Sequence, residues 1–95
     1  MAQWPKRKPW HDGERVEWNL DNGYILSAVK FTGSYGYKED KWELAIIDKD
    51  LKTFVDPPAD RMENILYDYY KADEGIYGYL NDPDVDRIVE MVKRL

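Results

Sequence analysis

The sequence predicts an α+β fold in which an antiparallel β-meander of three or four strands is followed by two C-terminal α-helices packed on the sheet. Three observations lead to it. Residues 14–31 alternate apolar and polar side chains around an Asn-Gly pair, residues 44–47 form an unbroken apolar run, and residues 62–92 carry two apolar stripes at helical spacing. A chain of 95 residues is long enough for one domain, which we place at residues 14–95.

The first two predicted strands form a hairpin. Glu14–Leu20 alternates apolar and polar residues, which is typical of a strand with one wet face. Asn22-Gly23 tolerates positive φ at both central positions of a turn, as a type I′ hairpin requires. Tyr24–Phe31 is therefore expected to return antiparallel to the first strand.

The third predicted strand, Trp42–Asp48, is expected to organise the sheet. Its apolar run, Leu44–Ile47, is typical of a strand covered on both faces. Thr32–Asp40, which contains two glycines, is expected to be the loop before this strand. Leu51–Val55 is expected to add a short fourth strand.

The first predicted helix follows Pro57-Pro58 and ends at about Lys71. Its apolar residues recur at i, i+3, i+4 and i+7, as one face of a helix requires; they are Met62, Ile65, Leu66 and Tyr69. Gly75–Leu80 is expected to be an apolar linker that packs on the sheet edge.

The second predicted helix closes the chain. Asn81 or Asp82 can cap it and Pro83 suits its first turn. Its apolar stripe is Val85, Ile88, Val89 and Val92. Acidic residues near its start and basic residues near its end complement the helix dipole.

Residues 1–13 are predicted to be an N-terminal arm outside the sheet core. They contain two prolines, the basic cluster Lys6–Lys8, the tryptophans Trp4 and Trp10, and the single histidine, His11. Two interpretations stay open. The tryptophans fold back onto the domain, or the arm binds nucleic acid through cations and stacking indoles.

Composition restricts the classes of protein and of site. The chain has no cysteine, which excludes disulfides, thiolate metal sites and thiol nucleophiles. It shows no secretory signal and no apolar run long enough to span a membrane, so we expect a cytoplasmic protein without a membrane partner. Residues 1–38 carry six Lys or Arg and four Asp or Glu, whereas residues 39–90 carry six and fifteen. The second half is therefore strongly acidic.

We predict no catalytic, cofactor-binding or metal-binding residue. The single histidine lies in the arm, and neither Ser27 nor Ser34 has a histidine near it in the sequence. The Asp-x-Asp-x-Asp pattern at residues 82–86 resembles the start of a calcium loop, but Arg87 replaces the required glycine and Lys93 the required glutamate. The protein is therefore expected not to be an enzyme.

The acidic half is interleaved with tyrosines, and this combination predicts a protein-binding surface. Carboxylates steer a basic partner and tyrosines supply contact area. The residues predicted to bind the partner are Tyr35, Tyr37, Asp60, Glu63, Tyr67, Asp68, Tyr70, Asp73 and Glu74. We expect a small acidic interaction module that binds a basic surface, such as that of a nucleic-acid-handling protein, and that fits a phage- or mobile-element-encoded inhibitor.

Alternatives stay open at this point. The acidic residues could serve solubility alone. The arm containing Lys6–Lys8 could bind nucleic acid, and a small enzyme with an unrecognised carboxylate site is also compatible with the sequence.

Overall fold

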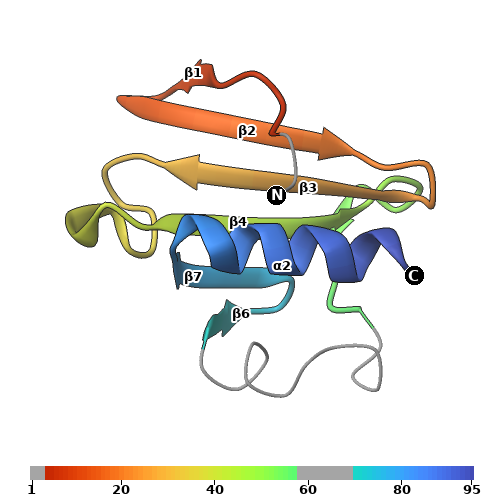
Figure 1. Ribbon diagram of the computed structural model, residues 1–95. Helices are drawn as coiled ribbons and strands as arrows, with labels where there is room; N and C mark the ends of the chain where they lie inside the picture. Colours follow the sequence, from red (N-terminus) through yellow and green to blue (C-terminus); the bar gives the residue numbers. More distant parts are fainter. Residues whose placement is uncertain (1–3, 58–69) are drawn as a thin grey trace.

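The computed structural model describes residues 4–57 and 70–95. Within these residues seven strands form one antiparallel sheet in the order β1-β2-β3-β4-β7-β6, and β5 pairs with β4 beside this path. The C-terminal helix α2 lies across one side of the sheet (Figure 1). The N-terminal half of the chain therefore supplies one edge of the sheet, and residues after β5 supply the other.

The first five strands follow the chain from the N-terminus. They are β1 (Lys8–Trp10), β2 (Gly13–Asn19), β3 (Tyr24–Lys30), β4 (Trp42–Asp48) and β5 (Thr53–Phe54). Each of β2 to β5 pairs antiparallel with the strand before it.

The remaining elements complete the sheet and cover it. The 3-10 turn η1 (Tyr37–Glu39) lies between β3 and β4. The strands β6 (Lys71–Asp73) and β7 (Ile76–Leu80) form a hairpin, and α2 spans Asp82–Lys93. β7 joins the free side of β4, where Ala45 pairs with Ile76.

The predicted meander of three or four strands with two packed helices is wrong. The described residues form a seven-stranded sheet and contain one α-helix, α2. Gly75–Leu80, predicted as an apolar linker, belongs instead to the β6–β7 hairpin, and so does Lys71, near which the first helix was predicted to end. Its turn is held by contacts distant in the sequence, because Gly75 O accepts from Ile46 N at 2.8 Å and Asp56 accepts from Gly75 N at 2.8 Å. The stripe from Met62 to Tyr69 lies outside the described residues.

The predicted hairpin is confirmed, but its turn differs from type I′. β2 and β3 pair with Asn19 opposite Ile25, and Leu20 N donates to Tyr24 O at 3.0 Å. Gly23 has φ 95°, whereas Asn22 is not among the residues of positive φ. The loop is therefore one residue longer than a two-residue turn, with glycine in the left-handed position.

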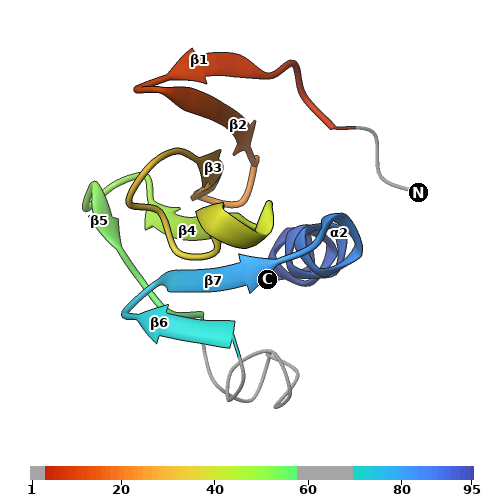
Figure 2. The same ribbon diagram turned by 90° about the vertical axis from the view of Figure 1, so that its left-hand side faces the viewer.

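β4 occupies the middle of the sheet, yet only one of its faces meets the helix. Leu44 and Ile46 are fully buried on the α2 side, whereas Ala45 and Ile47 on the other side are half-buried. The prediction that both faces of this strand are covered is therefore wrong. Figure 2 shows α2 on one side of the sheet and β5 on the other.

The predicted C-terminal helix is confirmed together with its start. Asn81 Oδ1 accepts from Asp84 N at 2.9 Å, and Asp84 Oδ2 accepts from Asn81 N at 3.2 Å, so both residues satisfy free helix donors. Pro83 lies in the first turn. The apolar stripe of α2 packs on Leu26, Leu44, Ile46 and Tyr77 of the sheet in one core.

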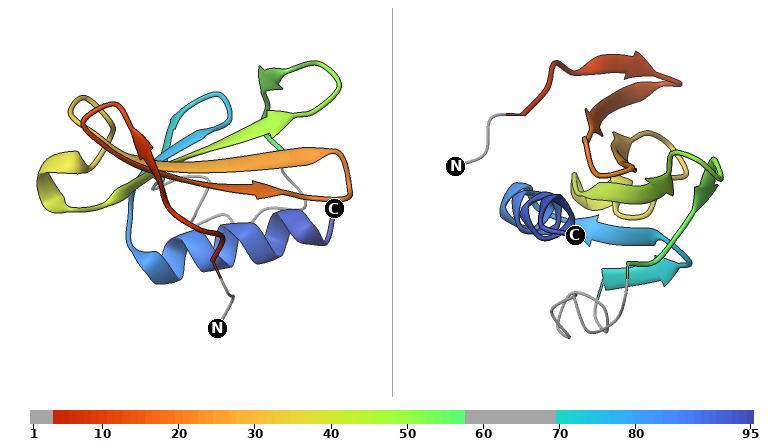
Figure 3. Two further views of the ribbon diagram at one scale, coloured as in Figure 1. Left: turned by 90° about the horizontal axis from the view of Figure 1, so that it is seen from above. Right: turned by 90° about the vertical axis from the view of Figure 1, so that its right-hand side faces the viewer.

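The N-terminal segment lies against this core. The ring of Trp4 contacts Trp18 edge-on at a centroid distance of 5.3 Å and Trp42 at 5.4 Å. Trp4 Nε1 also donates to Asp86 on α2. In Figure 3 the segment before β1 crosses from the sheet toward the helix. This placement agrees with the interpretation that the arm folds back. No helix within the described ranges is both long and apolar enough to cross a bilayer.

Candidate functional site

The face of the sheet opposite α2 is the strongest candidate for a binding surface. We call it the open face. Because side chains alternate along a strand, the residues that are not in the helix-side core all point to this face. The open face includes Arg15 and Glu17 of β2, Ile25, Ser27 and Val29 of β3, Glu43, Ala45 and Ile47 of β4, Phe54 of β5 and Ile76 of β7.

A hollow of about 340 Å³ lies on the open face. Val29, Ala45 and Ile47 contribute apolar side chains to its lining. Aromatic rings from both ends of the face also line it, Trp10 from β1 and Phe54 from β5, and they are 37% and 52% exposed. Large aromatic side chains left this exposed on either side of an apolar hollow mark a candidate contact surface.

Arg15 is fixed on this face by three neighbours. Its Nε donates to Ser27 Oγ at 2.8 Å, and its Nη2 pairs with Glu17 Oε2 at 2.6 Å. The guanidinium lies 4.6 Å from the centroid of the Trp10 ring. The charge of Arg15 is thus already neutralised, and the stack holds Trp10 in place.

Glu43 supplies a carboxylate to this face for which the described part of the chain provides no counter-ion. It lines the same hollow and is half-buried. Its Oε1 accepts a hydrogen bond from Tyr35 N at 3.1 Å. Among the described residues it forms no ion pair. A partly desolvated carboxylate without a cation favours a positively charged partner group.

A second hollow, of about 470 Å³, adjoins the first at Phe54. Its lining includes Phe54, Ile76 and two carboxylates of the β6–β7 turn, Asp73 and Glu74. Both acidic residues are exposed, and the one basic residue in the lining is Lys52. Phe54 therefore stands between two hollows that each contain carboxylate groups.

The β1–β2 turn is tied to the end of β3. Asp12 accepts from Thr32 N at 2.9 Å and also from the Thr32 hydroxyl. The hydroxyl bond first, and then the backbone bond, lower the pKa of Asp12 below its usual value. His11, at φ 52°, stacks on Phe31 with a centroid distance of 4.9 Å. These contacts keep β1 and Trp10 at the border of the open face.

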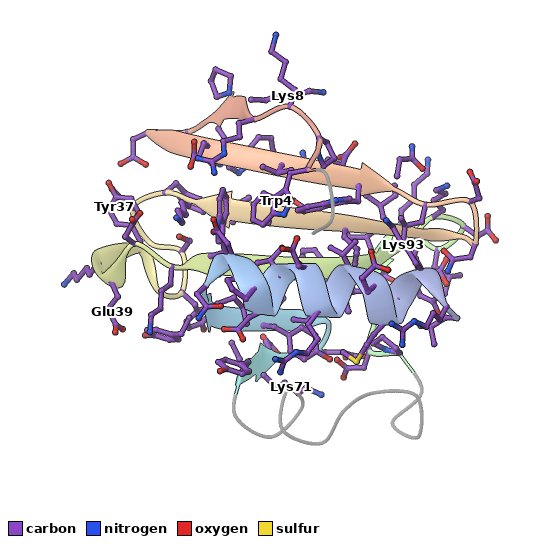
Figure 4. All side chains as sticks on the ribbon, viewed as in Figure 1. Trp4, Lys8, Tyr37, Glu39, Lys71 and Lys93 are labelled. Carbon is purple, nitrogen blue, oxygen red and sulfur yellow. The ribbon has the colours of Figure 1, made fainter. Side chains whose placement is uncertain are left out.

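Three exposed tyrosines gather at the end of the sheet where β3 and β4 are connected. Tyr35, Tyr37 and Tyr79 are 46%, 40% and 49% exposed. A Cβ on Gly78 would lie 2.5 Å from the Tyr35 Cβ, so glycine permits the loop to pack on β7. Tyr79 has φ 60°, a left-handed conformation rare for tyrosine. Figure 4 shows Tyr37 and Glu39 at this end of the molecule.

The five predicted partner-binding residues that lie within residues 4–57 and 70–95 do not gather into one surface. Asp73 ends β6 and Glu74 follows it in the turn before β7, whereas Tyr35 packs on Gly78 in the middle of β7. Tyr70 is half-buried and packs against the core. The other predicted residues, Asp60, Glu63, Tyr67 and Asp68, lie outside the described residues.

The basic cluster of the arm is divided in the structure. Arg7 pairs with Glu14 at 3.1 Å, and its guanidinium lies 5.4 Å from the Trp42 ring centroid. Lys8 begins β1 and points away from the sheet (Figure 4). Lys6 is exposed. The three cations therefore face different neighbours.

Sequence reasoning missed four residues of the open face, Trp10, Arg15, Glu43 and Phe54. One signal was available in β4, where Glu43, Ala45 and Ile47 alternate with the larger Trp42, Leu44 and Ile46. Such alternation indicates two different faces. Arg15 lies on the predicted hairpin and Phe54 in the predicted fourth strand, so their strands were expected but not their place on a common face with Glu43. Trp10 comes from β1, which the sequence did not indicate as a strand.

The hydroxyls of Ser27 and Ser34 both serve structural contacts. Ser34 Oγ donates to Phe31 O at 2.8 Å and accepts from Phe31 N, and Ser27 accepts from Arg15. No group of three or more metal-ligating side chains occurs within residues 4–57 and 70–95.

Comparisons with known proteins found no counterpart. No family model, no curated protein and no solved structure matches this chain.

Proposed function

We propose that the protein is a non-enzymatic interaction module that binds a basic segment of another protein on its open face. One observation carries the proposal. The hollow of about 340 Å³ combines an apolar lining and exposed aromatic rings with the half-buried carboxylate of Glu43, which forms no ion pair among the described residues.

The aromatic and the acidic residues of this surface contribute to binding in different ways. Trp10 and Phe54 offer aromatic area that a partner can desolvate, and buried aromatic contacts dominate the affinity of many interfaces. Glu43, with Asp73 and Glu74 in the adjoining hollow, favours approach of positive charge. The net charge of the chain, −5, adds long-range attraction for a basic partner.

The same argument favours a partner surface that ordinarily binds nucleic acid, because such surfaces are rich in lysine and arginine. A small protein that covers this surface would act as an inhibitor. We place the protein in the cytoplasm, because small secreted domains usually contain disulfides and this chain has no cysteine.

The test uses three labelled peptides in fluorescence anisotropy titrations. The basic peptide contains arginine, valine and serine in mixed order, a second has lysine in place of arginine, and a third has glutamate. We expect both basic peptides to bind and the glutamate peptide not to bind. Binding of the basic peptides should weaken as salt is added, since exposed charges are screened beyond about 8 Å at physiological ionic strength.

Matched variants locate the site. Phe54→Ala and Glu43→Gln should each weaken binding of the basic peptides. Leu51→Ala removes another exposed apolar side chain, 68% exposed, from the neighbouring turn, and Glu90→Gln removes a carboxylate from α2 on the other side of the sheet. Both controls should bind as the unmodified protein does. Equal losses in all four variants, or equal binding of the glutamate peptide, would contradict the proposal.

A further inference from the structure

We infer that Ala45 is the floor of a subsite for one large apolar side chain of the basic segment, such as leucine. The inference rests on the proposed function and names the anchor residue that the segment places on the open face. The observation that carries it is a small side chain surrounded by larger ones in the middle of an uncovered sheet face.

The strand register places Ala45 at the centre of this arrangement. Its neighbours on the same face of β4 are Glu43 on one side and Ile47 on the other, because side chains alternate along a strand. Across the sheet Ala45 pairs with Ser27 of β3 and with Ile76 of β7. Three of these four neighbours have much longer side chains than alanine, so the surface is depressed at Ala45.

The fourth neighbour, Ser27, is covered by a larger side chain. Arg15 Nε donates to Ser27 Oγ at 2.8 Å, and the guanidinium of Arg15 lies 4.6 Å from the ring centroid of Trp10. Ser27 is 7% exposed, whereas Ala45 is half-buried. Arg15 and Trp10 therefore bound the hollow on the side of β3, and Ala45 is the accessible part of its floor.

The volume and the chemistry of the hollow suit an apolar side chain. The hollow measures about 340 Å³, whereas a cavity of about 150 Å³ in a protein core accommodates benzene. Ala45 has no polar side-chain atom, and apolar Ile47 follows it on the same face. A leucine placed on Ala45 removes apolar surface of both molecules from water, which is favourable.

The charges around Ala45 indicate which apolar segment binds there. Glu43 lies two residues before Ala45 on the same face and forms no ion pair among the described residues. Ile76, on the other side of Ala45, lines the adjoining hollow together with Asp73 and Glu74. An apolar anchor flanked by arginine or lysine complements these carboxylates, whereas an anchor flanked by acidic residues is repelled.

The experiment compares two labelled basic peptides in fluorescence anisotropy titrations. Both contain arginine and serine, and they differ only at one central position, which is leucine in one peptide and alanine in the other. We expect the unmodified protein to bind the leucine peptide roughly tenfold more tightly, because partial burial of a leucine contributes on the order of the free energy that a tenfold change represents.

Two variants fill the depression with a side chain of the protein itself. Ala45→Leu and Ala45→Val should each remove most of the preference for leucine and retain binding of the alanine peptide. Because Ala45 lies on the open face, its larger replacements extend away from the core. Thr53→Leu is the control, since it adds an apolar side chain at an exposed position outside the lining of this hollow, and it should keep the full preference. Circular dichroism and thermal unfolding confirm that each variant is folded.

The outcomes separate this subsite from the proposed function. Equal affinity for the leucine and alanine peptides would overturn the subsite and leave the proposed function intact. A preference that persists in folded Ala45→Leu, or one that Thr53→Leu removes equally, would show that leucine binds elsewhere, which also overturns the subsite. If neither peptide binds the unmodified protein, the proposed function fails and the inference fails with it.

Discussion

The side-chain amide of Asn22 donates a hydrogen bond to the backbone carbonyl of Val92, with an N···O distance of 2.7 Å. The same amide reaches Leu95 O at 3.3 Å. The turn between β2 and β3 therefore supplies a further donor to carbonyls at the end of α2, where Val92 O also accepts from Leu95 N at 3.1 Å. Asn22 thus ties the C-terminal end of the helix to this turn.

Asn22→Ala should lower the free energy of unfolding by about 1 kcal/mol, because a hydrogen bond between distant parts of the chain is lost. Asn22→Asp should cost more, since it places negative charge beside the negative end of the helix dipole. Urea denaturation measures both. Asp21→Ala, at the neighbouring exposed position, is the control, and an equal loss there would contradict the capping role.

Trp4→Ala should destabilise the protein, because it uncovers Trp18 and Trp42. The expected cost is roughly 2–4 kcal/mol, less than that of the most deeply buried tryptophans. Trp4→Phe keeps a ring but loses the hydrogen bond to Asp86, so a smaller loss of about 1 kcal/mol is expected. Thermal unfolding is the measurement. Lys6→Ala should leave the midpoint unchanged, and an unchanged midpoint in Trp4→Ala would show that the indole does not stabilise the core.

Asp56 should make the stability of the protein depend on pH. Burial alone would raise the pKa of Asp56, but the hydrogen bond and charge of Lys71, with donors from Gly75 N and Tyr77 Oη, lower the pKa below its usual value. A carboxylate with a lowered folded pKa stabilises the fold above its unfolded pKa of about 3.9. This stabilisation is lost as the pH falls through the folded pKa.

The measurement compares unfolding free energies of the unmodified protein and of Asp56→Asn over a range of pH. The difference should be largest near neutral pH and should shrink below about pH 4. A difference that stays constant across this range would mean that the ionised carboxylate is not what stabilises the β6–β7 turn.

Gly75→Ala should lower the free energy of unfolding more than Gly23→Ala does, although both glycines have positive φ, at 70° and 95°. The strain of a left-handed alanine, about 1 kcal/mol, applies to both. A Cβ on Gly75 would also lie 2.6 Å from Val55 N, whereas a Cβ on Gly23 meets nothing within 4 Å. The clash should add roughly 1–3 kcal/mol to the loss of unfolding free energy that chemical denaturation measures. Equal costs would show that Val55 can move aside freely.

The elements that sequence reasoning found are those specified by nearby residues. The β2–β3 hairpin follows from Gly23 and its flanking alternation, and α2 follows from Asn81, Pro83 and a regular apolar stripe. The buried position of Ile46 also follows from the apolar run of β4. Local turn and capping preferences agree with the tertiary fold at these positions.

The elements that were missed depend on partners far along the chain. β6 is only Lys71–Asp73, with no apolar alternation, and it is a strand because the adjoining turn bonds to Ile46 and Asp56. β1 contains Pro9, which weakens the sequence signal for a strand. The open face was missed for a related reason, since Trp10 reaches it from β1, which was not predicted, and the face that Phe54 takes depends on its register with Ile47.

The position of β7 beside β4 determines how the chain must fold. β2, β3 and β4 can pair through short connections, whereas β4 and β7 meet only after the segment between them, residues 49–75, has closed into a loop. Closing a longer loop costs more conformational entropy before any stabilising contact forms, and non-local pairing therefore slows folding. We therefore expect the transition state to contain the β2–β4 hairpins, with the β6–β7 hairpin docking late. Substitutions in β7 should then speed unfolding more than they slow folding.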